Sequence, residues 1–372
     1  MPDSSEAAVP ITVPAVSAES KRDSYGYGGE TIRQPDYTVV VPVVSDLFDS
    51  DTGINARRLL QTAIALADDN DGRVLLLGVT EVPDADTVRQ VRAYTGRGDG
   101  GEQLPETVTE RRTQLARVLN VAEDIDPAVS VRALVRVVTD TTQGILAALG
   151  SRWTAVLLLR GTGFGESRLL GKSTIDTVID EAECDVFVEN IGSREGAGAL
   201  YVPDVEGHTV ASLAESATEP IESILLPVGT GPHAALASEA ARAVARAFDA
   251  SVTALHVVSP DASREERSDA RDLLTFTEHV LGEVEFEIEL REASDPTAVI
   301  IEEAQNHDFT SIGSPEQKFG LRELLFEPVQ ETLVGEKDVT VLMGRDADRT
   351  MRSLYYRYTR AIENSETDEP SE

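Results

Sequence analysis

The residues of this chain best suited to chemistry form a glycine-rich stretch near its middle. Gly161, Gly163 and Gly165 alternate with other residues, and Gly171-Lys172-Ser173-Thr174 follows where a helix is expected to begin. Glycines let backbone amides approach an anion, and the N-terminal amides of a helix favour phosphate. The stretch therefore predicts an anion site. The alternative is a tight loop whose glycines only satisfy backbone geometry.

The same stretch is not a P-loop of the NTPase type. Gly171-Lys172-Ser173 has the correct ending, but the position that requires the first glycine is occupied by Glu166. A P-loop also joins the first strand of its domain to a helix, whereas this stretch follows the fourth expected strand. We therefore exclude P-loop hydrolysis.

The sequence contains no motif for other catalytic chemistry or for metal binding. Gly-x-Ser-x-Gly is absent, and none of the histidines has metal-ligand spacing, which predicts structural roles for His208, His233, His256, His279 and His307. Cys184 is the single cysteine, so no disulfide forms within the chain. We interpret it as a small buried residue; a reactive thiol is the alternative. We expect no catalytic residue and no metal site.

Alternating strands and helices must position the glycine-rich stretch. We expect strands at 38–44, 74–79, 130–137, 155–159 and 186–188, and helices at 56–69, 106–121, 142–149 and 173–183. Continuous apolar strands separated by amphipathic helices predict a parallel sheet covered on both faces. Ligands of such sheets bind beyond the carboxyl ends of the strands.

The whole pattern occurs twice. Val39-Val40-Val41-Pro42-Val43 recurs as Ile224-Leu225-Leu226-Pro227-Val228, residues 73–79 recur at 251–257, and residues 184–188 match 337–341. The second copy has expected strands at 223–228, 252–258, 284–290, 309–313 and 339–343, and expected helices at 234–248, 263–281, 296–306 and 328–335. The sequence therefore predicts an α/β protein with two tandem doubly wound domains.

Composition sets the expected boundaries. Residues 1–35 are expected to be a disordered extension, 36–193 the first domain, 194–220 a linker, 221–345 the second domain, and 346–372 a C-terminal amphipathic helix with an acidic tail. The C-terminal helix is locally rich in arginine. We expect it to pack on its own domain; the alternative is a docking element for another subunit or a membrane protein.

Charge restricts the environment and the partners. The chain has 66 acidic and 33 basic residues, a net charge of −33, and only four lysines. Such a surface repels itself unless salt screens it, which suggests the salt-rich cytoplasm of a halophile. The negative field argues against nucleic acid as a partner. We find no membrane-spanning stretch and no signal peptide, so we expect a soluble, cytoplasmic protein that is not membrane-embedded.

The arrangement resembles the universal stress protein family. The supporting residues are Gly161, nine residues and Gly171, then Ser173, with Ser-Arg-Leu-Leu at 167–170. The chain departs from the family pattern at two positions. Leu158 stands where the family has the first glycine of its loop, and Val44 stands where the family has an acid after the first strand. The resemblance implies five-stranded parallel sheets of the adenine nucleotide alpha hydrolase type and, in many members, bound ATP or AMP.

The resemblance assigns any nucleotide to the first domain. ATP or AMP would lie against Val43, Val44, Gly161, Gly163, Gly165, Gly171, Lys172, Ser173 and Thr174. In the second domain Phe326-Glu327-Pro328 replaces the Gly-Ser at the helix start, and Glu327 would repel phosphate. Gly229 stands there in place of the acid after strand one.

The second half also looks like the soluble domains joined to haloarchaeal amino acid permeases of the cationic transporter type. This resemblance implies a non-enzymatic regulatory or sensing module, which would act on such a transporter in trans. We expect the two domains to form a pseudo-dimer within one chain, or the chain to form a homodimer. The alternative functions are a nucleotide-dependent enzyme, either a slow ATPase or an adenylating enzyme, and a ligand-free dimeric scaffold.

Overall fold

The computed structural model of the 372-residue chain describes residues 9, 11–12, 37–45, 56–96, 104–126, 128–149, 154–159, 173–190, 220–231, 233–314 and 340–347. The expected linker and C-terminal helix lie almost wholly outside these residues. Most of the glycine-rich stretch and the 315–339 segment of the second half also lie outside them.

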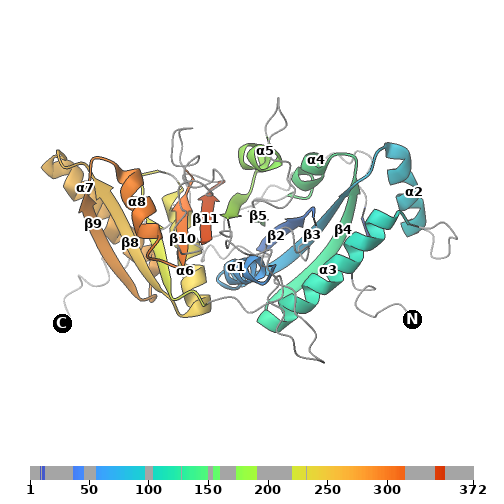
Figure 1. The fold of residues 1–372 in the computed structure, drawn as a ribbon, viewed down its shortest axis with the longest axis horizontal. Coiled ribbons are helices and arrows are strands. Elements are labelled where there is room, and N and C mark those ends of the chain that lie inside the picture. The colour runs from blue at the N-terminus through green and yellow to red at the C-terminus, as the bar shows by residue number, and fades with distance from the viewer. Residues whose placement is uncertain are drawn as a thin grey trace, which may run out of the picture.

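The first half folds as a five-stranded parallel sheet with helices on both faces (Figure 1). Its strands are β2 (Thr38–Val43), β3 (Arg73–Glu81), β4 (Ser130–Val138), β5 (Thr154–Leu159) and β6 (Asp185–Asn190). Its helices are α1 (Ala56–Asp68), α2 (Ala85–Gly96), α3 (Glu106–Ile125), α4 (Thr141–Leu146) and α5 (Thr174–Glu181). The strand order is β4-β3-β2-β5-β6. Along the chain, β3 and β4 are added on one side of β2, and β5 and β6 are then added on its other side.

The second half repeats this order as β9-β8-β7-β10-β11. Its strands are β7 (Ser223–Pro227), β8 (Ser251–Val258), β9 (Phe286–Glu292), β10 (Phe309–Gly313) and β11 (Thr340–Arg345). Its described helices are α6 (Ala234–Phe248), α7 (Arg264–Leu281) and α8 (Pro296–Ala304). The predicted doubly wound α/β fold is confirmed.

The first helix of each half, α1 and α6, ends in the same way. Asp71 follows α1 with φ 51°, and Asp249 follows α6 with φ 56°, so each helix closes on an aspartate in the left-handed region. A Cβ atom at Gly72 would lie 2.6 Å from the carbonyl oxygen of Tyr37. Glycine is therefore required there for the chain to enter β3, which explains the predicted Asp71-Gly72 stop.

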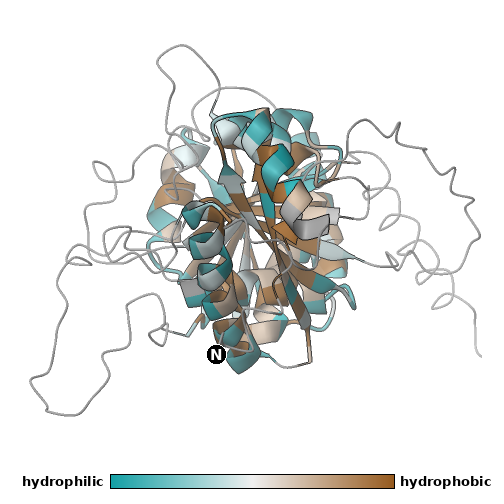
Figure 2. Ribbon diagram, turned by 90° about the vertical axis from the view of Figure 1, so that its right-hand side faces the viewer, coloured by the Kyte–Doolittle hydropathy of each residue, from teal (hydrophilic) through white to brown (hydrophobic). Residues whose placement is uncertain are grey.

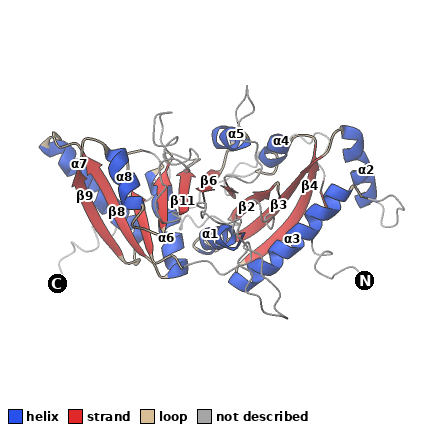
Figure 3. Ribbon diagram, in the orientation of Figure 1, coloured by secondary structure: helices blue, strands red, loops and turns tan. Residues whose placement is uncertain are grey.

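The two sheets join through their fifth strands. β6 pairs antiparallel with β11, so that Phe187 lies opposite Gly344, and Glu189 lies opposite Leu342. With the short strand β1 (Ile11–Thr12) beside β4, the described strands form one sheet of eleven, which Figure 3 shows running across the molecule. We call the β6–β11 ladder and the helix α1 packed on it the seam. The two halves are paired within one chain.

The strand register corrects one pair of corresponding residues that matching the two sequence copies suggested. In β5, Ala155 faces Asp185 of β6. At the same place in β10, Phe309 faces Thr340 of β11. Asp185 therefore corresponds to Thr340, whereas matching the sequence phrases paired it with Asp338. A shift of two residues keeps every side chain on its face of the sheet, so alternation alone cannot detect it.

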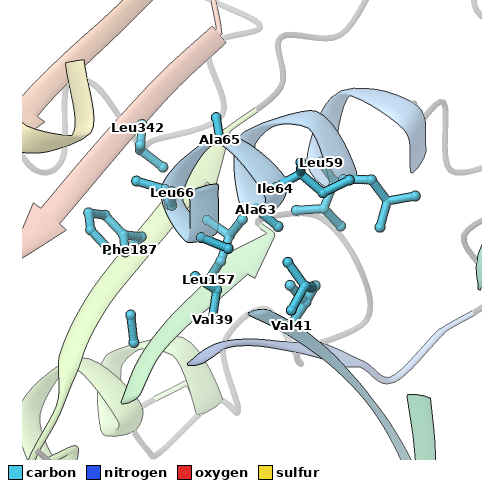
Figure 4. Packing of buried hydrophobic residues seen from close by; sticks show 14 of the residues in the cluster. Val39, Val41, Leu59, Ala63, Ile64, Ala65, Leu66, Leu157, Phe187 and Leu342 are labelled. Atoms are coloured by element: carbon cyan, nitrogen blue, oxygen red, sulfur yellow. The ribbon is translucent and has the colours of Figure 1, made fainter. Parts of the chain in front are cut away.

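Two apolar cores lie on opposite faces of the joined sheet. The larger core packs α1, α3, α6 and α7 against one face, and it continues across the seam from Phe187 to Leu342. Figure 4 shows α1 side chains, including Leu59 and Leu66, facing β2, β5 and β6. The other core packs α4, α5 and α8 against the second face. Hydrophobic residues accordingly concentrate in the centre of the molecule (Figure 2).

Three elements differ most from the expectations. The N-terminal extension contributes a strand, β1 (Ile11–Thr12), which pairs parallel with β4. Val9 beside it is fully buried, and its carbonyl oxygen accepts a 2.9 Å hydrogen bond from Arg112 Nε. Helix α2 was not expected, and α3 extends four residues beyond the expected end at Val121. The 1–35 segment is therefore not irregular throughout.

Candidate functional site

The candidate site lies where the strand order reverses, between the carboxyl ends of β2 and β5. Val43 ends β2, Val44 follows it, and Ser173 and Thr174 open α5. Val44 and Ile175 pack against the same buried cluster, so both segments cover one region of the sheet. The remaining predicted site residues lie outside the described residues: Gly161, Gly163, Gly165, Gly171 and Lys172.

The loop after β2 is held by an arginine that the sequence did not single out. Arg111 of α3 donates from Nη2 to the carbonyl oxygen of Val44 and from Nη1 to that of Ser45, both at 2.5 Å. Gly78 of β3 leaves the space for it, because a Cβ there would lie 3.0 Å from Arg111 Cγ. The side chain of Val43 points into the larger core and is 2% exposed. The valines thus shape the loop through their backbone.

Ser173 and Thr174 are engaged in hydrogen bonds at the start of α5. Ser173 is the N-cap, and its Oγ accepts from the backbone N–H of Asp176 at 3.1 Å and donates to the Asp176 carboxylate at 2.7 Å. The Thr174 hydroxyl lies 2.8 Å from that of Thr142 in α4. The carboxylate of Asp176 therefore already supplies negative charge to this helix N-terminus.

A second helix start nearby is also occupied by carboxylates. Asp140 caps α4 by accepting from the backbone N–H of Gln143 at 2.9 Å. Glu81, the last residue of β3, accepts from the Thr141 hydroxyl at 2.7 Å and from its backbone N–H at 3.1 Å. The described part of this sheet edge is thus acidic, which opposes an anion at α4.

The corresponding edge of the second half is built differently. His256 of β8 occupies the place of Gly78, and its Nδ1 lies 2.6 Å from the carbonyl oxygen of Val228. Because a carbonyl oxygen only accepts, Nδ1 carries the proton. Gly229, Thr230 and Gly231 beyond it are exposed. Each half therefore fixes its first loop with a nitrogen donor, from Arg111 in one and from His256 in the other.

Two more described histidines, His233 and His307, also make structural contacts. His233 Nδ1 accepts from the backbone N–H of Asp346 at 3.0 Å, and His307 Nε2 lies 3.1 Å from the Thr253 hydroxyl. Cys184 is buried, and burial raises the pKa of its thiol to about 12. The interpretation of Cys184 as a buried small residue is confirmed. His208 lies outside the described residues.

Within the described ranges, no group of three or more His, Cys, Asp and Glu residues could hold a metal ion. None of the helices described is both long and apolar enough to span a bilayer. The described groups at the candidate site are thus hydrogen-bond donors, hydroxyls and carboxylates. They can position a polar ligand, and their hydroxyl–carboxylate pairs, Ser173 with Asp176 and Thr141 with Glu81, hold the helix starts.

Comparison with solved structures gives weak overall similarity. A universal stress protein from Archaeoglobus fulgidus DSM 4304 is 17% identical, with a TM-score of 0.45, over 83% of this chain and 97% of that one. A putative universal stress protein from Pseudomonas aeruginosa UCBPP-PA14 is 16% identical, with a TM-score of 0.45, over 89% and 100%. The cytoplasmic domain of a prokaryotic cation chloride cotransporter is 12% identical, with a TM-score of 0.45, over 86% and 99%.

No curated protein matches the chain significantly. The model of the Universal stress protein family matches residues 220–345, which contain β7 to β11 and the complete repeated strand order of the second half. Residues 220–345 of the chain therefore match the universal stress protein family.

Proposed function

We propose that the chain is a non-enzymatic sensing and regulatory protein, built from two universal-stress-type units of which only the first takes an adenine nucleotide. The repeated strand order supports this proposal most directly, because it gives the first half the same topology as the family-matched second half. The topology leaves a ligand edge at the reversal between β2 and β5. The two edges differ in their described side chains, so the units differ in what they accept.

ATP or AMP would bind weakly at this edge. The glycine-rich stretch and Lys172 supply the amides and the positive charge that phosphate requires, and Ser173 and Thr174 begin the helix that follows. Asp176 opposes phosphate at the same helix start, which is why we propose weak binding. A nucleotide would have to displace the Asp176 carboxylate from Ser173 or bind beside it.

Ligand retention tests the nucleotide proposal. The full chain is purified in molar KCl, bound small molecules are released for mass analysis, and melting is followed with increasing ATP or AMP. Saturating ligand at 100 times Kd should stabilise the protein by about 2.7 kcal/mol. Lys172→Ala should abolish the shift, whereas Lys318→Ala in the corresponding loop of the second unit should preserve it. A melting temperature that ignores millimolar ATP and AMP rejects nucleotide sensing.

A ligand-free scaffold is the second candidate, and the carboxylates at the helix starts favour it. Asp176, Asp140 and Glu81 make hydrogen bonds at the starts of α5 and α4, where a phosphate would otherwise bind. Under this hypothesis the seam would present two fixed units to a partner. Stoichiometric nucleotide released from the purified protein would exclude it.

We also propose that the chain regulates an amino acid permease in trans. The likeness of Gly231-Pro232-His233-Ala234 to permease-linked soluble domains motivates this, and Gly231 is exposed beside the start of α6. The test co-expresses the chain with a permease that lacks its own soluble domain and measures amino acid uptake. A change in uptake that ATP or AMP modulates supports the proposal. Unchanged uptake contradicts it.

A further inference from the structure

A fully buried glutamate lies in the seam. Glu189 of β6 is 0% exposed, and its neighbours across the sheet are Leu159 of β5 and Leu342 of β11. Helix α1 covers it and contributes Thr62, which is also buried. A carboxyl group in such surroundings is costly to ionise, because it is fully buried and its neighbours on both adjacent strands are leucines.

The Thr62 hydroxyl can hydrogen-bond Glu189 in either protonation state. Thr62 Oγ1 lies 2.7 Å from Glu189 Oε1 and 3.3 Å from the backbone carbonyl oxygen of Arg58, but it has one proton. A protonated Glu189 can donate to the threonine, which then donates to the carbonyl. An ionised Glu189 needs the proton of Thr62 for itself. Its Oε2 has no hydrogen-bond partner among the described residues.

The charged groups nearby are already arranged around other contacts. Arg58 of α1 lies with its guanidinium 5.8 Å from the centre of the Phe248 ring of α6. Arg242 and Arg246 of α6 bind Asp69 at the end of α1, at 2.8 and 2.7 Å. On the two seam strands, Arg345 donates to the carbonyl oxygens of Ala182 and Cys184, and Asp185 accepts from the backbone of Ala347. The remaining charged residue of α6 is Glu239.

The repeat shows that the fold does not require an acid here. By strand register the position equivalent to Glu189 in the second half is Gly344. A Cβ atom at Gly344 would lie 3.4 Å from the Phe187 ring and 3.3 Å from Leu236, so packing explains the glycine. The packing does not explain the glutamate, whose surroundings are the Thr62 hydroxyl, two leucines and the charge of Arg58.

We propose that Glu189 is a proton-binding site that makes the contact between the two halves depend on pH. With its proton, the side chain completes the Thr62 hydrogen bonds and lets α1 pack on the β6–β11 ladder. Without it, a charge is buried under α1, and α1 and the ladder separate more readily so that water reaches the carboxylate. The device is independent of any nucleotide.

The direction of the pH dependence follows from the buried state. Burial raises the pKa of Glu189 from 4.5 to about 7, and the Thr62 hydrogen bond and the Arg58 charge oppose the rise. The closed seam therefore holds a proton that the open seam releases between about pH 4.5 and 7. In that window opening becomes about tenfold more favourable with each pH unit, and it levels off above pH 7.

Amide hydrogen exchange of β6 and β11 tests the proposal. The full chain and Glu189→Gln are compared at constant molar KCl from pH 5 to 8, because glutamine keeps the shape of the protonated acid. The amide protection factor of Glu189→Gln divided by that of the wild type should rise about 100-fold from pH 5 to pH 8. Glu183→Gln, an exposed acid just before β6, should follow the wild type. If the protection of the wild type and of Glu189→Gln changes with pH in parallel, the proposal is refuted.

Direct titration keeps the proposal testable if Glu189→Gln does not fold. Carbon-13 labelling of glutamate carboxyls should reveal one group that titrates near pH 7 in the wild type. Thr62→Val, which removes the stabilising hydroxyl, should move that titration to higher pH. A spectrum in which every glutamate of the folded protein titrates below pH 5.5 would overturn the inference.

Discussion

At the residue scale, the loop after β2 depends on a single long-range arginine. Arg111 reaches from α3 to two carbonyl oxygens 66 and 67 residues away and also contacts Gln114 Oε1 at 2.9 Å. Carbonyl groups in this half-buried loop need donors, and a guanidinium provides several in one plane. Arg111 therefore fixes the path of the chain past Val43 and Val44.

Replacing Arg111 with leucine should destabilise the first unit by about 2–3 kcal/mol, because charged donors are lost from two partly buried carbonyl groups. Urea unfolding in molar KCl measures the change in the free energy of unfolding. Arg132→Leu, which removes an exposed arginine from β4, provides the matched control and should change stability by about 0.5 kcal/mol or less. Equal effects of both substitutions would show that the loop contacts contribute little.

At the element scale, α1 and α6 hold the halves together with polar contacts that the repeat does not share. The side chain of Asp69 is 3% exposed and receives both Arg242 and Arg246. In the repeat, Arg242 stands at the position of Ile64, and Asp69 at that of Ala247. The ion pairs therefore occur on one side of the α1–α6 contact only.

Asp69→Asn should destabilise the folded chain by about 1–3 kcal/mol, because it leaves Arg242, which is 17% exposed, without its counter-charge. Thermal or urea unfolding measures this loss. Asp68→Asn removes an exposed acid one residue away and should have a small effect, within about 0.5 kcal/mol. If the asparagine at 69 costs no more than the one at 68, the ion pairs do not stabilise the contact.

The elements that could be predicted were those with a local signature. Apolar strands and the Asp71-Gly72 stop are visible in a short window, and the structure contains them. Helix α2 has few apolar residues at helical spacing, with Val88 and Val91 packing on the larger core, so its period is weak. Strand β1 has two residues and exists only because β4 offers an edge.

The contacts of the candidate site and of the seam were harder to predict, because they join residues that are far apart in the sequence. The contact of Arg111 with Val44 depends on packing between α3 and β2, which no local pattern records. The burial of Glu189 depends on pairing between strands about 150 residues apart. His256 offered one signal, since it replaces Gly78 in an otherwise matching strand. The glycine-rich stretch remains a prediction, because most of it lies outside the described residues.

At the scale of the whole molecule, charge should decide where the fold is stable. The net charge is −33, and the described edge of the first unit is also acidic. Screening reduces the reach of such charges from about 10 Å at 0.1 M salt to about 3 Å at 1 M. Repulsion within the folded state should therefore weaken as salt rises.

The melting temperature should accordingly increase steeply between 0.1 and 2 M KCl, as expected for a protein of a salt-rich cytoplasm. Differential scanning calorimetry measures it, with sucrose at matched osmolarity as the control for solvent exclusion. A rise in KCl that sucrose does not reproduce supports charge screening. A melting temperature that stays constant across this salt range would contradict a halophilic adaptation.

The seam also has an evolutionary consequence. A substitution in the gene of a symmetric dimer appears at two places in its interface, and both must tolerate it. Here each seam position is encoded once, so the first half can carry Glu189 without a second acid at the equivalent position, where Gly344 lies opposite Phe187. Holding both units in one chain thus lets each side of the interface change alone.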